Sequence, residues 1–342
     1  MKVALVHDFL NQYGGAEKVL EALHEIWPES PVYTLIYDSK KMPENFRTWD
    51  IRTSPIQNLP LGVKKYRWYL PLMPSAIERF DLSGYDLVIS DSSAYAKGVL
   101  TGPKTIHISY CHTPTRYLWS EAHTYLEGVK EGMGLARKLI SPFLSYLRVW
   151  DYQAAQRPEY MLANSHFIAS RIKKYYHREV ERVIWPPVEV EKFYLSPDLE
   201  NYFLLISRFR PYKKIDLAIR AFNKLKIPLK IIGTGEKKDL LKLAKPNIEF
   251  LDFVSEEEKA KYLAHCQALI HPQEEDFGIV ACEAMAAGRP VIAYRAGGAL
   301  ETIVENETGL FFDEQTWESL AMAVLKFKTS NFNSEKIRHH AL

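Results

Sequence analysis

Short apolar runs alternate with amphipathic stretches along the chain, and they form two sets. The runs cover residues 2–6, 32–36, 87–90, 105–110, 160–164 and 183–184 in the first set, and 202–206, 229–232, 248–251, 268–270, 291–293 and 309–311 in the second. Strand-length apolar runs separated by helical patterns are typical of βαβ units, which stack into parallel sheets covered by helices. The pattern predicts an α/β protein with two Rossmann-like, doubly wound domains.

A segment rich in proline and charge separates the two sets. Trp185-Pro186-Pro187 ends the first set and a polar stretch follows it, as is typical of a domain boundary. We predict domains over residues 1–187 and 201–328, a linker over 188–200, and over 329–342 the start of a terminal helix that stops without a cap, as a truncated helix would. Ligands of doubly wound sheets bind at the carboxyl ends of the strands, so we expect the site in a cleft between the two domains.

Charge and cysteine content narrow the class of protein. The 342 residues carry 44 lysines and arginines against 42 acidic residues, and this balance gives no electrostatic argument for nucleic-acid binding. The three cysteines lack the spacing of a zinc site or a disulfide framework. His7 and Asp8 interrupt the first apolar run before a signal peptide or membrane span is complete. We expect a cytoplasmic protein with reduced thiols, no metal site and a local anion site.

Glycines and cations follow two of the predicted strands. Gly14 and Gly15 precede an amphipathic helix, where backbone amides could approach an anion, although a plain βα turn explains them as well. Residues 207–214 carry four cations, of which Arg208 and Lys213 could neutralise a diphosphate; a solvated basic loop is the alternative. The pair Gly233 and Gly235 lacks the third glycine of a dinucleotide fingerprint.

The most informative stretch runs from Glu275 to Pro290 and predicts a loop, a helix and a strand. Gly278 could free the amides at the start of the helix to bind a sugar or phosphate oxygen. Glu275 and Glu283 lie eight positions apart, so they could accept hydrogen bonds from the hydroxyls of a hexose and a ribose, or act as the acid and base of a glycosidase. The apolar neighbours of Glu283 predict a mostly buried side chain.

Two features of the first half complete the candidates. His112 follows the predicted strand over 105–110, so it could bind a sugar or an acceptor at a carboxyl end, or be a core histidine. Residues 64–70 and 137–150 mix cations with large apolar side chains. That mixture suits either a membrane surface or helix packing inside the domain.

Six motifs in order resemble the retaining GT-B glycosyltransferases of family 4 across nearly the whole chain. They are GGAEKVL, SYCHTPTRYLW, LANSHFIASRI, VIWPPVEVEKF, ISRFRPYKKIDLAI and HPQEEDFGIVACEAMAAGRPVIAYRAGGALETI. Glu275 and Glu283 fit the E-x7-E pattern of that family. Within that family, the sequences of these motifs are most similar to O-antigen-type mannosyltransferases, chiefly through CHTPTRYLW and EEDFGIVACEAMAAGRPVIA.

The resemblance implies a hexosyltransferase with no cofactor and no required metal. It would transfer mannose from GDP-mannose to a saccharide or lipid-linked glycan in lipopolysaccharide or polysaccharide synthesis, with peripheral contact to the cytoplasmic membrane face. The alternatives are a GT-B enzyme that uses a UDP-sugar, a non-catalytic subunit that binds nucleotide-sugar, and a sugar-nucleotide epimerase.

The resemblance also implies roles for individual residues. Arg208 and Lys213 would hold the diphosphate, Glu275 the hexose and Glu283 the ribose, while Gly15 would approach the β-phosphate and His112 the reactive face of the sugar. The catalytic set is His112, Arg208, Lys213 and Glu275, and the donor-binding set is Gly14, Gly15, Arg208, Lys213, Gly233, Gly235, Val254, Glu275, Phe277, Gly278, Ile279 and Glu283. Lys214 and Asp252 depart from the family, because relatives usually carry glycine there.

Overall fold

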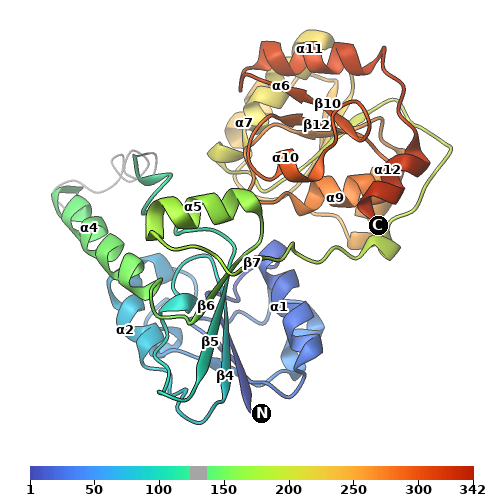
Figure 1. The fold of residues 1–342 in the computed structure, drawn as a ribbon. Coiled ribbons are helices and arrows are strands. Elements are labelled where there is room, and N and C mark those ends of the chain that lie inside the picture. The colour runs from blue at the N-terminus through green and yellow to red at the C-terminus, as the bar shows by residue number, and fades with distance from the viewer. Residues whose placement is uncertain (124–136) are drawn as a thin grey trace. The chain divides into compact units, whose positions relative to one another are not determined.

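The computed structural model describes residues 1–123 and 137–342, and these form two compact units (Figure 1). The units are Met1–Pro187 and Val188–Leu342. Each consists of one parallel sheet and the helices that connect its strands. The predicted pair of doubly wound α/β domains is therefore confirmed.

The first unit contains a seven-stranded sheet in the order β3-β2-β1-β4-β5-β6-β7. The strands are β1 (Val3–His7), β2 (Val32–Thr34), β3 (Ile51–Thr53), β4 (Leu87–Ser92), β5 (Ile106–Cys111), β6 (Tyr160–Ala163) and β7 (Arg182–Val183). The chain order reverses between β1 and β4, which makes this pair the switch point of the sheet. Six of the seven strands coincide with predicted runs; β3, a short edge strand that alternates half-buried and exposed residues, was not predicted.

Helices connect these strands. They are α1 (Gly15–Ile26), α2 (Met73–Glu78), α4 (Arg137–Ala154) and α5 (His166–Tyr176), with the 3-10 helices η1 (Glu44–Thr48), η2 (Pro55–Asn58), η3 (Tyr66–Leu72) and η4 (Ala96–Gly98). Helix α1 buries Val19 and Leu20, and every residue of β1 and β4 is buried. The central strands are therefore covered on both faces, as the continuous apolar runs predict.

The second unit contains a six-stranded sheet in the order β10-β9-β8-β11-β12-β13. The strands are β8 (Phe203–Ile206), β9 (Leu229–Ile232), β10 (Ile248–Asp252), β11 (Leu269–His271), β12 (Val291–Tyr294) and β13 (Gly309–Phe312). The helices are η6 (Val190–Lys192), η7 (Pro211–Lys213), α6 (Ile215–Leu225), α7 (Lys238–Leu243), α8 (Glu256–His265), α9 (Ile279–Ala286), α10 (Ala299–Thr302), α11 (Trp317–Phe327) and α12 (Ser334–Ala341). The order reverses between β8 and β11.

The first and last segments of the second unit pack on helix α9. Phe193 and Ile337 are buried in the same apolar cluster as Met285. Arg338 of α12 donates a hydrogen bond to the carbonyl oxygen of Phe193 at 2.6 Å. Both ends of the unit are thus fastened to the helix that follows Gly278.

The two positions that depart from the family share one backbone conformation. Lys214, between η7 and α6, has φ 52°, and Asp252, where the pairing of β10 with β9 shifts register, has φ 54°. This left-handed region costs a residue with a Cβ about 1–2 kcal/mol, whereas glycine adopts it freely. This backbone geometry is the one that favours the glycine that the family resemblance implies at these positions.

Candidate functional site

The carboxyl ends of β8 and β11 place charged and polar side chains at the switch point of the second unit. Arg208 follows β8 and is half-buried. His271 ends β11, and Gln273 and Glu275 follow it. Since β8 and β11 are neighbours, the topology brings these residues to one edge of the sheet.

Glu275 lies at the centre of this edge. Lys213 forms an ion pair with its Oε1, and Nε2 of Gln273 donates to the same oxygen at 2.9 Å. Burial alone would raise the pKa of Glu275, but the charges of Lys213 and His271 and the hydrogen bonds from Lys213 and Gln273 together outweigh burial and lower the pKa to about 2. Burial lowers the pKa of neighbouring His271 to about 4. At neutral pH the edge therefore presents an ionised carboxylate, an ammonium group and a neutral imidazole.

Gly278 begins helix α9 in a conformation that favours glycine. Its φ is 96°, and it precedes Ile279, the first residue of the helix. A Cβ on Gly298 would lie 2.4 Å from the Cα of Phe277, so the loop packs directly on a second glycine. The amide of Gly298 donates to the carbonyl oxygen of Glu275 at 2.9 Å. The prediction missed Gly298, although the GG in RAGGALE is visible in the sequence.

Glu283 lies on α9 and is 2% exposed, so its predicted burial is confirmed. Its Oε1 accepts a hydrogen bond from Nζ of Lys259 at 2.9 Å, and the same ammonium group contacts Glu256 at 2.8 Å. Lys259, on α8, was not predicted. The helical pattern of α8 is visible in the sequence, but the approach of its lysine to a buried carboxylate is a tertiary contact.

Gly233 and Gly235 bring the loop after β9 against the connection after β8. A Cβ on Gly233 would lie 1.8 Å from the carbonyl oxygen of Ser207, and one on Gly235 would lie 2.8 Å from that of Phe209. Only glycine permits this approach, which places the loop beside the residues flanking Arg208. Val254, after β10, is half-buried.

His112 belongs to a different cluster, at the carboxyl edge of the first sheet. Its Nε2 lies 2.5 Å from Oδ1 of Asp91, and Nδ1 of His7 lies 2.8 Å from Oδ2 of the same carboxylate. His7 ends β1, Asp91 lies in β4 and His112 follows β5. Asp91 and His7 were not predicted as site residues, although each lies near the carboxyl end of a predicted strand.

Gly14 and Gly15 lie next to this cluster along the chain. Gly14 caps helix α1 with an extended backbone, and Gly15 is the first residue of the helix. The first turn carries Glu17, which is buried and has its Oε1 3.7 Å from Nε2 of His7. The GGAE motif therefore contributes an acid to the cluster, in addition to its glycines.

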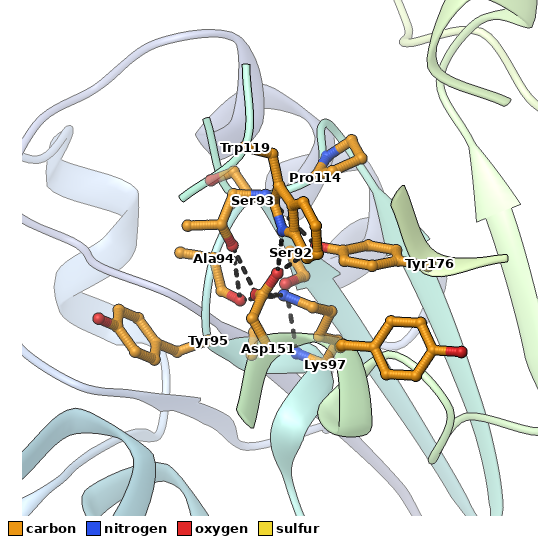
Figure 2. Close-up of polar contacts among 12 residues, drawn as sticks. Ser92, Ser93, Ala94, Tyr95, Lys97, Pro114, Trp119, Asp151 and Tyr176 are labelled. Carbon is orange, nitrogen blue, oxygen red and sulfur yellow. Dashed lines mark hydrogen bonds and ion pairs between the residues drawn. The ribbon is translucent and has the colours of Figure 1, made fainter. Parts of the chain in front are cut away.

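A buried network holds the loop that follows His112 (Figure 2). Asp151 of α4 accepts hydrogen bonds from Nζ of Lys97 at 2.6 Å and from Thr115 Oγ1 at 2.7 Å with one oxygen. Its other oxygen accepts from Nε1 of Trp119 at 2.7 Å and from the hydroxyl of Tyr176 at 2.9 Å. The carboxylate thus joins four segments of the first unit. Among residues 1–123 and 137–342, no three His, Cys, Asp or Glu side chains are grouped to hold a metal ion.

Two doubly wound units with polar switch-point edges define the class: the chain has the GT-B fold of glycosyltransferases. Residues 189–341 match the model of the family described as Glycosyl transferases group 1. The second unit therefore belongs to that family.

Relatives with known names are distant. The chain is 26% identical over 307 residues to the Alpha-1,3/1,6-mannosyltransferase ALG2 of Dictyostelium discoideum, covering 74% of this chain and 69% of that protein. It is 27% identical to the human GDP-Man:Man(3)GlcNAc(2)-PP-Dol alpha-1,2-mannosyltransferase, covering 90% of this chain and 75% of that protein. It is 32% identical over 162 residues to the Uncharacterized glycosyltransferase MJ1178 of Methanocaldococcus jannaschii, covering 46% of this chain and 45% of that protein.

Solved structures share the fold along the whole chain. Sucrose-phosphate synthase from Thermosynechococcus elongatus superposes with a TM-score of 0.75 at 16% identity, covering 99% of this chain and 94% of that one. Anabaena HepE in complex with UDP-glucose gives 0.73 at 18%, covering 100% and 93%. WaaG, a glycosyltransferase involved in lipopolysaccharide biosynthesis, gives 0.67 at 18%, covering 99% and 95%.

Proposed function

We propose that this chain is a retaining, metal-independent mannosyltransferase that takes mannose from GDP-mannose. The acceptor is a saccharide or lipid-linked glycan of cell-surface polysaccharide synthesis. The motif resemblance and the names of the mannosyltransferase relatives support this donor. The observation that carries the proposal is the contact of Lys213 with ionised Glu275 beside Gly278, in the unit that matches the glycosyltransferase family.

Charge arrangement supports a nucleotide-diphosphate sugar as donor. Lys213 and Arg208 bind the diphosphate, and the ionised Glu275 accepts hydrogen bonds from hydroxyls of the hexose. The amides of residues 277–279 lie at the start of α9, where an oxygen of the sugar or phosphate is a favourable ligand. One turn further along, Glu283 binds the ribose.

The remaining donor contacts come from loops at the carboxyl edges of both sheets. Gly233 and Gly235 let the backbone approach the diphosphate, and Val254 contacts the base. In the first unit, Gly14 and Gly15 approach the β-phosphate, and His112 lies by the sugar.

The transfer needs little acid-base chemistry from the protein. The bond between the anomeric carbon and the β-phosphate oxygen breaks while the acceptor oxygen bonds to that carbon on the same face. The proton of the acceptor hydroxyl passes to the departing phosphate. Lys213 and Arg208 stabilise the charge on the leaving group, and such preorganised charge is commonly the largest contribution to catalysis.

A calorimetric titration tests the donor assignment. GDP and UDP are titrated side by side, followed by GDP-mannose and UDP-glucose, so that base and sugar are separated. Binding of GDP and GDP-mannose alone supports the proposal. Binding of UDP and UDP-glucose alone would mean that the donor is a UDP-sugar, as in the HepE complex, and would leave the class of enzyme unchanged.

Two lysine variants test the role of Lys213. Lys213→Met should abolish most of the binding, whereas Lys214→Met, which removes the same charge one residue further on, should not. Equal losses in the two variants would contradict the role of Lys213.

We also propose that the protein works at the cytoplasmic face of a membrane. The structure has no helix in its described residues of the length and apolar character that a membrane span requires. The exposed Trp68 of η3 lies beside Arg67 of the same helix and near Lys65, the residue that precedes this helix, and offers an aromatic anchor among cations. Residues 137–150, the second segment predicted to suit a membrane surface, lie within α4, and the structure describes their side chains from residue 140 onward.

A further inference from the structure

Four ionisable side chains form a line of alternating charge in the first unit. Glu17 of α1 faces His7 at 3.7 Å, His7 binds Asp91 at 2.8 Å, and Asp91 binds His112 at 2.5 Å. All four side chains are buried. They come from one helix, two strands and the residue after a third strand, so the line is a product of the sheet topology.

Asp91 determines which nitrogen of His112 is available. One carboxylate oxygen binds Nε2 of His112 and the other binds His7, so both oxygens are used and neither ring can turn without losing a bond. The edge-on ring of Tyr110, 5.2 Å away, packs against His112. The side chain of His112 keeps 10% of its surface exposed. Nδ1 is therefore the nitrogen that remains for a ligand.

Electrostatics favour a proton on both histidines. Burial alone would lower the pKa of each ring. For His7, the hydrogen bond with Asp91 and the nearby negative charges of Asp91 and Glu17 together outweigh burial and raise the pKa to about 10. For His112, attraction to Asp91 outweighs burial, with a smaller contribution from Asp8 and opposition from His7, and the net pKa is raised. The two rings lower the pKa of Asp91 against the opposite effect of its own burial.

A third histidine of the same sheet shows that burial does not by itself produce this state. His107 of β5 is fully buried, and Nε2 of its ring lies 2.9 Å from the hydroxyl of Ser90. Its Nδ1 has no hydrogen-bond partner among the described residues, and burial lowers its pKa to about 3. Burial without a carboxylate beside the ring therefore favours the neutral form of a histidine in this core. The rings of His7 and His112 differ because the carboxylates of Glu17 and Asp91 lie beside them.

We infer that Asp91, held in place by His7, is a positioning residue that aims Nδ1 of His112 at the donor and keeps a proton on it. The inference rests on the proposed function, because it assigns the partner of Nδ1 as an oxygen of the bound nucleotide-sugar. Nε2–H donates to Asp91, so protonation converts Nδ1 from an acceptor into a donor toward that oxygen. Through Glu17, the same line ties His112 to the first turn of α1, next to Gly15.

Nitrogen-15 NMR of the histidine rings tests the inference without any substrate, and His112→Gln assigns the signal. In the unmodified protein at pH 7, both nitrogens of His112 should carry protons. A neutral ring would overturn the inference. In Asp91→Asn, the proton affinity of His112 should fall by about tenfold to a thousandfold. Ser90→Ala is the control, because it alters the neighbouring residue of β4 and should leave the His112 signal unchanged.

Transfer kinetics give the functional readout. Asp91→Asn should lower kcat by about a hundredfold or more and move the alkaline limb of the pH profile to lower pH, while donor KM changes less than kcat. An unchanged pH profile, or an unchanged His112 titration in that variant, would overturn the positioning role. Should the unmodified protein transfer no sugar from any nucleotide donor, the proposed function fails, and the NMR titration still decides whether Asp91 controls His112.

Discussion

Replacement of Asp151 offers the sharpest test of how the first unit is held together. Asp151→Asn keeps the shape of the side chain but removes its charge, and the ammonium group of Lys97 is 1% exposed. Lys97 would keep its hydrogen bond to the carbonyl oxygen of Ala94. The new amide group would also turn its NH2 toward donors, either Trp119 and Tyr176 or Lys97 and Thr115.

The structure sets an order of magnitude for this loss. Removing one partner of a buried ion pair typically costs about 3–5 kcal/mol, because the other charge stays buried without compensation. Lys97→Met should cost less, about 1–3 kcal/mol, since the carboxylate that it leaves behind keeps three hydrogen bonds to neutral donors, each worth about 1.5 kcal/mol or more. We therefore expect Asp151→Asn to lower the free energy of unfolding more than Lys97→Met does.

Urea unfolding followed by tryptophan fluorescence measures this difference. Six of the seven tryptophans lie in the first unit, so the signal reports mainly on that unit. Asp50→Asn serves as the control, because its ion pair with Arg52 is about half exposed and should contribute under 1 kcal/mol. A smaller loss in Asp151→Asn than in Lys97→Met, or a loss equal to that of the control, would refute the reasoning.

Four further predictions follow from the structure. Glu275→Gln should abolish transfer while leaving the fold intact, and retained activity would remove Glu275 from the donor site. The contribution of His7 to stability should be complete below pH 6.5, its ordinary pKa, and be lost as pH rises through about 10. The melting temperature, measured across that pH range, should therefore depend less on pH in His7→Gln than in the unmodified protein. Lys214→Gly should stabilise the second unit by about 0.5–1 kcal/mol by relieving the left-handed backbone, whereas Arg220→Gly, at an exposed position in the middle of α6, should cost about 1 kcal/mol, as calorimetry can show. Trp68→Ala should weaken sedimentation with anionic vesicles, and unchanged binding would leave residues 64–70 as a packing segment.

The sequence was sufficient for most of the fold. Continuous apolar runs located all six strands of the second unit, because a strand covered on both faces has apolar residues at successive positions. The same reasoning could not find Ile51–Thr53, an edge strand whose side chains are half-buried or exposed. Local backbone chemistry was also visible: Gly278 begins α9 with a positive φ, and Glu283 is buried on that helix.

The contacts that build the two candidate sites depended on tertiary structure. A sequence pattern shows that His7 and His112 lie near carboxyl ends of strands, but it does not show which strands are neighbours. The order β1-β4-β5 and the register that places His7 opposite Asp91 bring both rings to one carboxylate. In the same way, Lys259 reaches Glu283, 24 positions away, and Lys97 reaches Asp151, 54 positions away. Such pairs form because the packing of the whole unit excludes water from both charges, and periodicity along the chain carries no information about that packing.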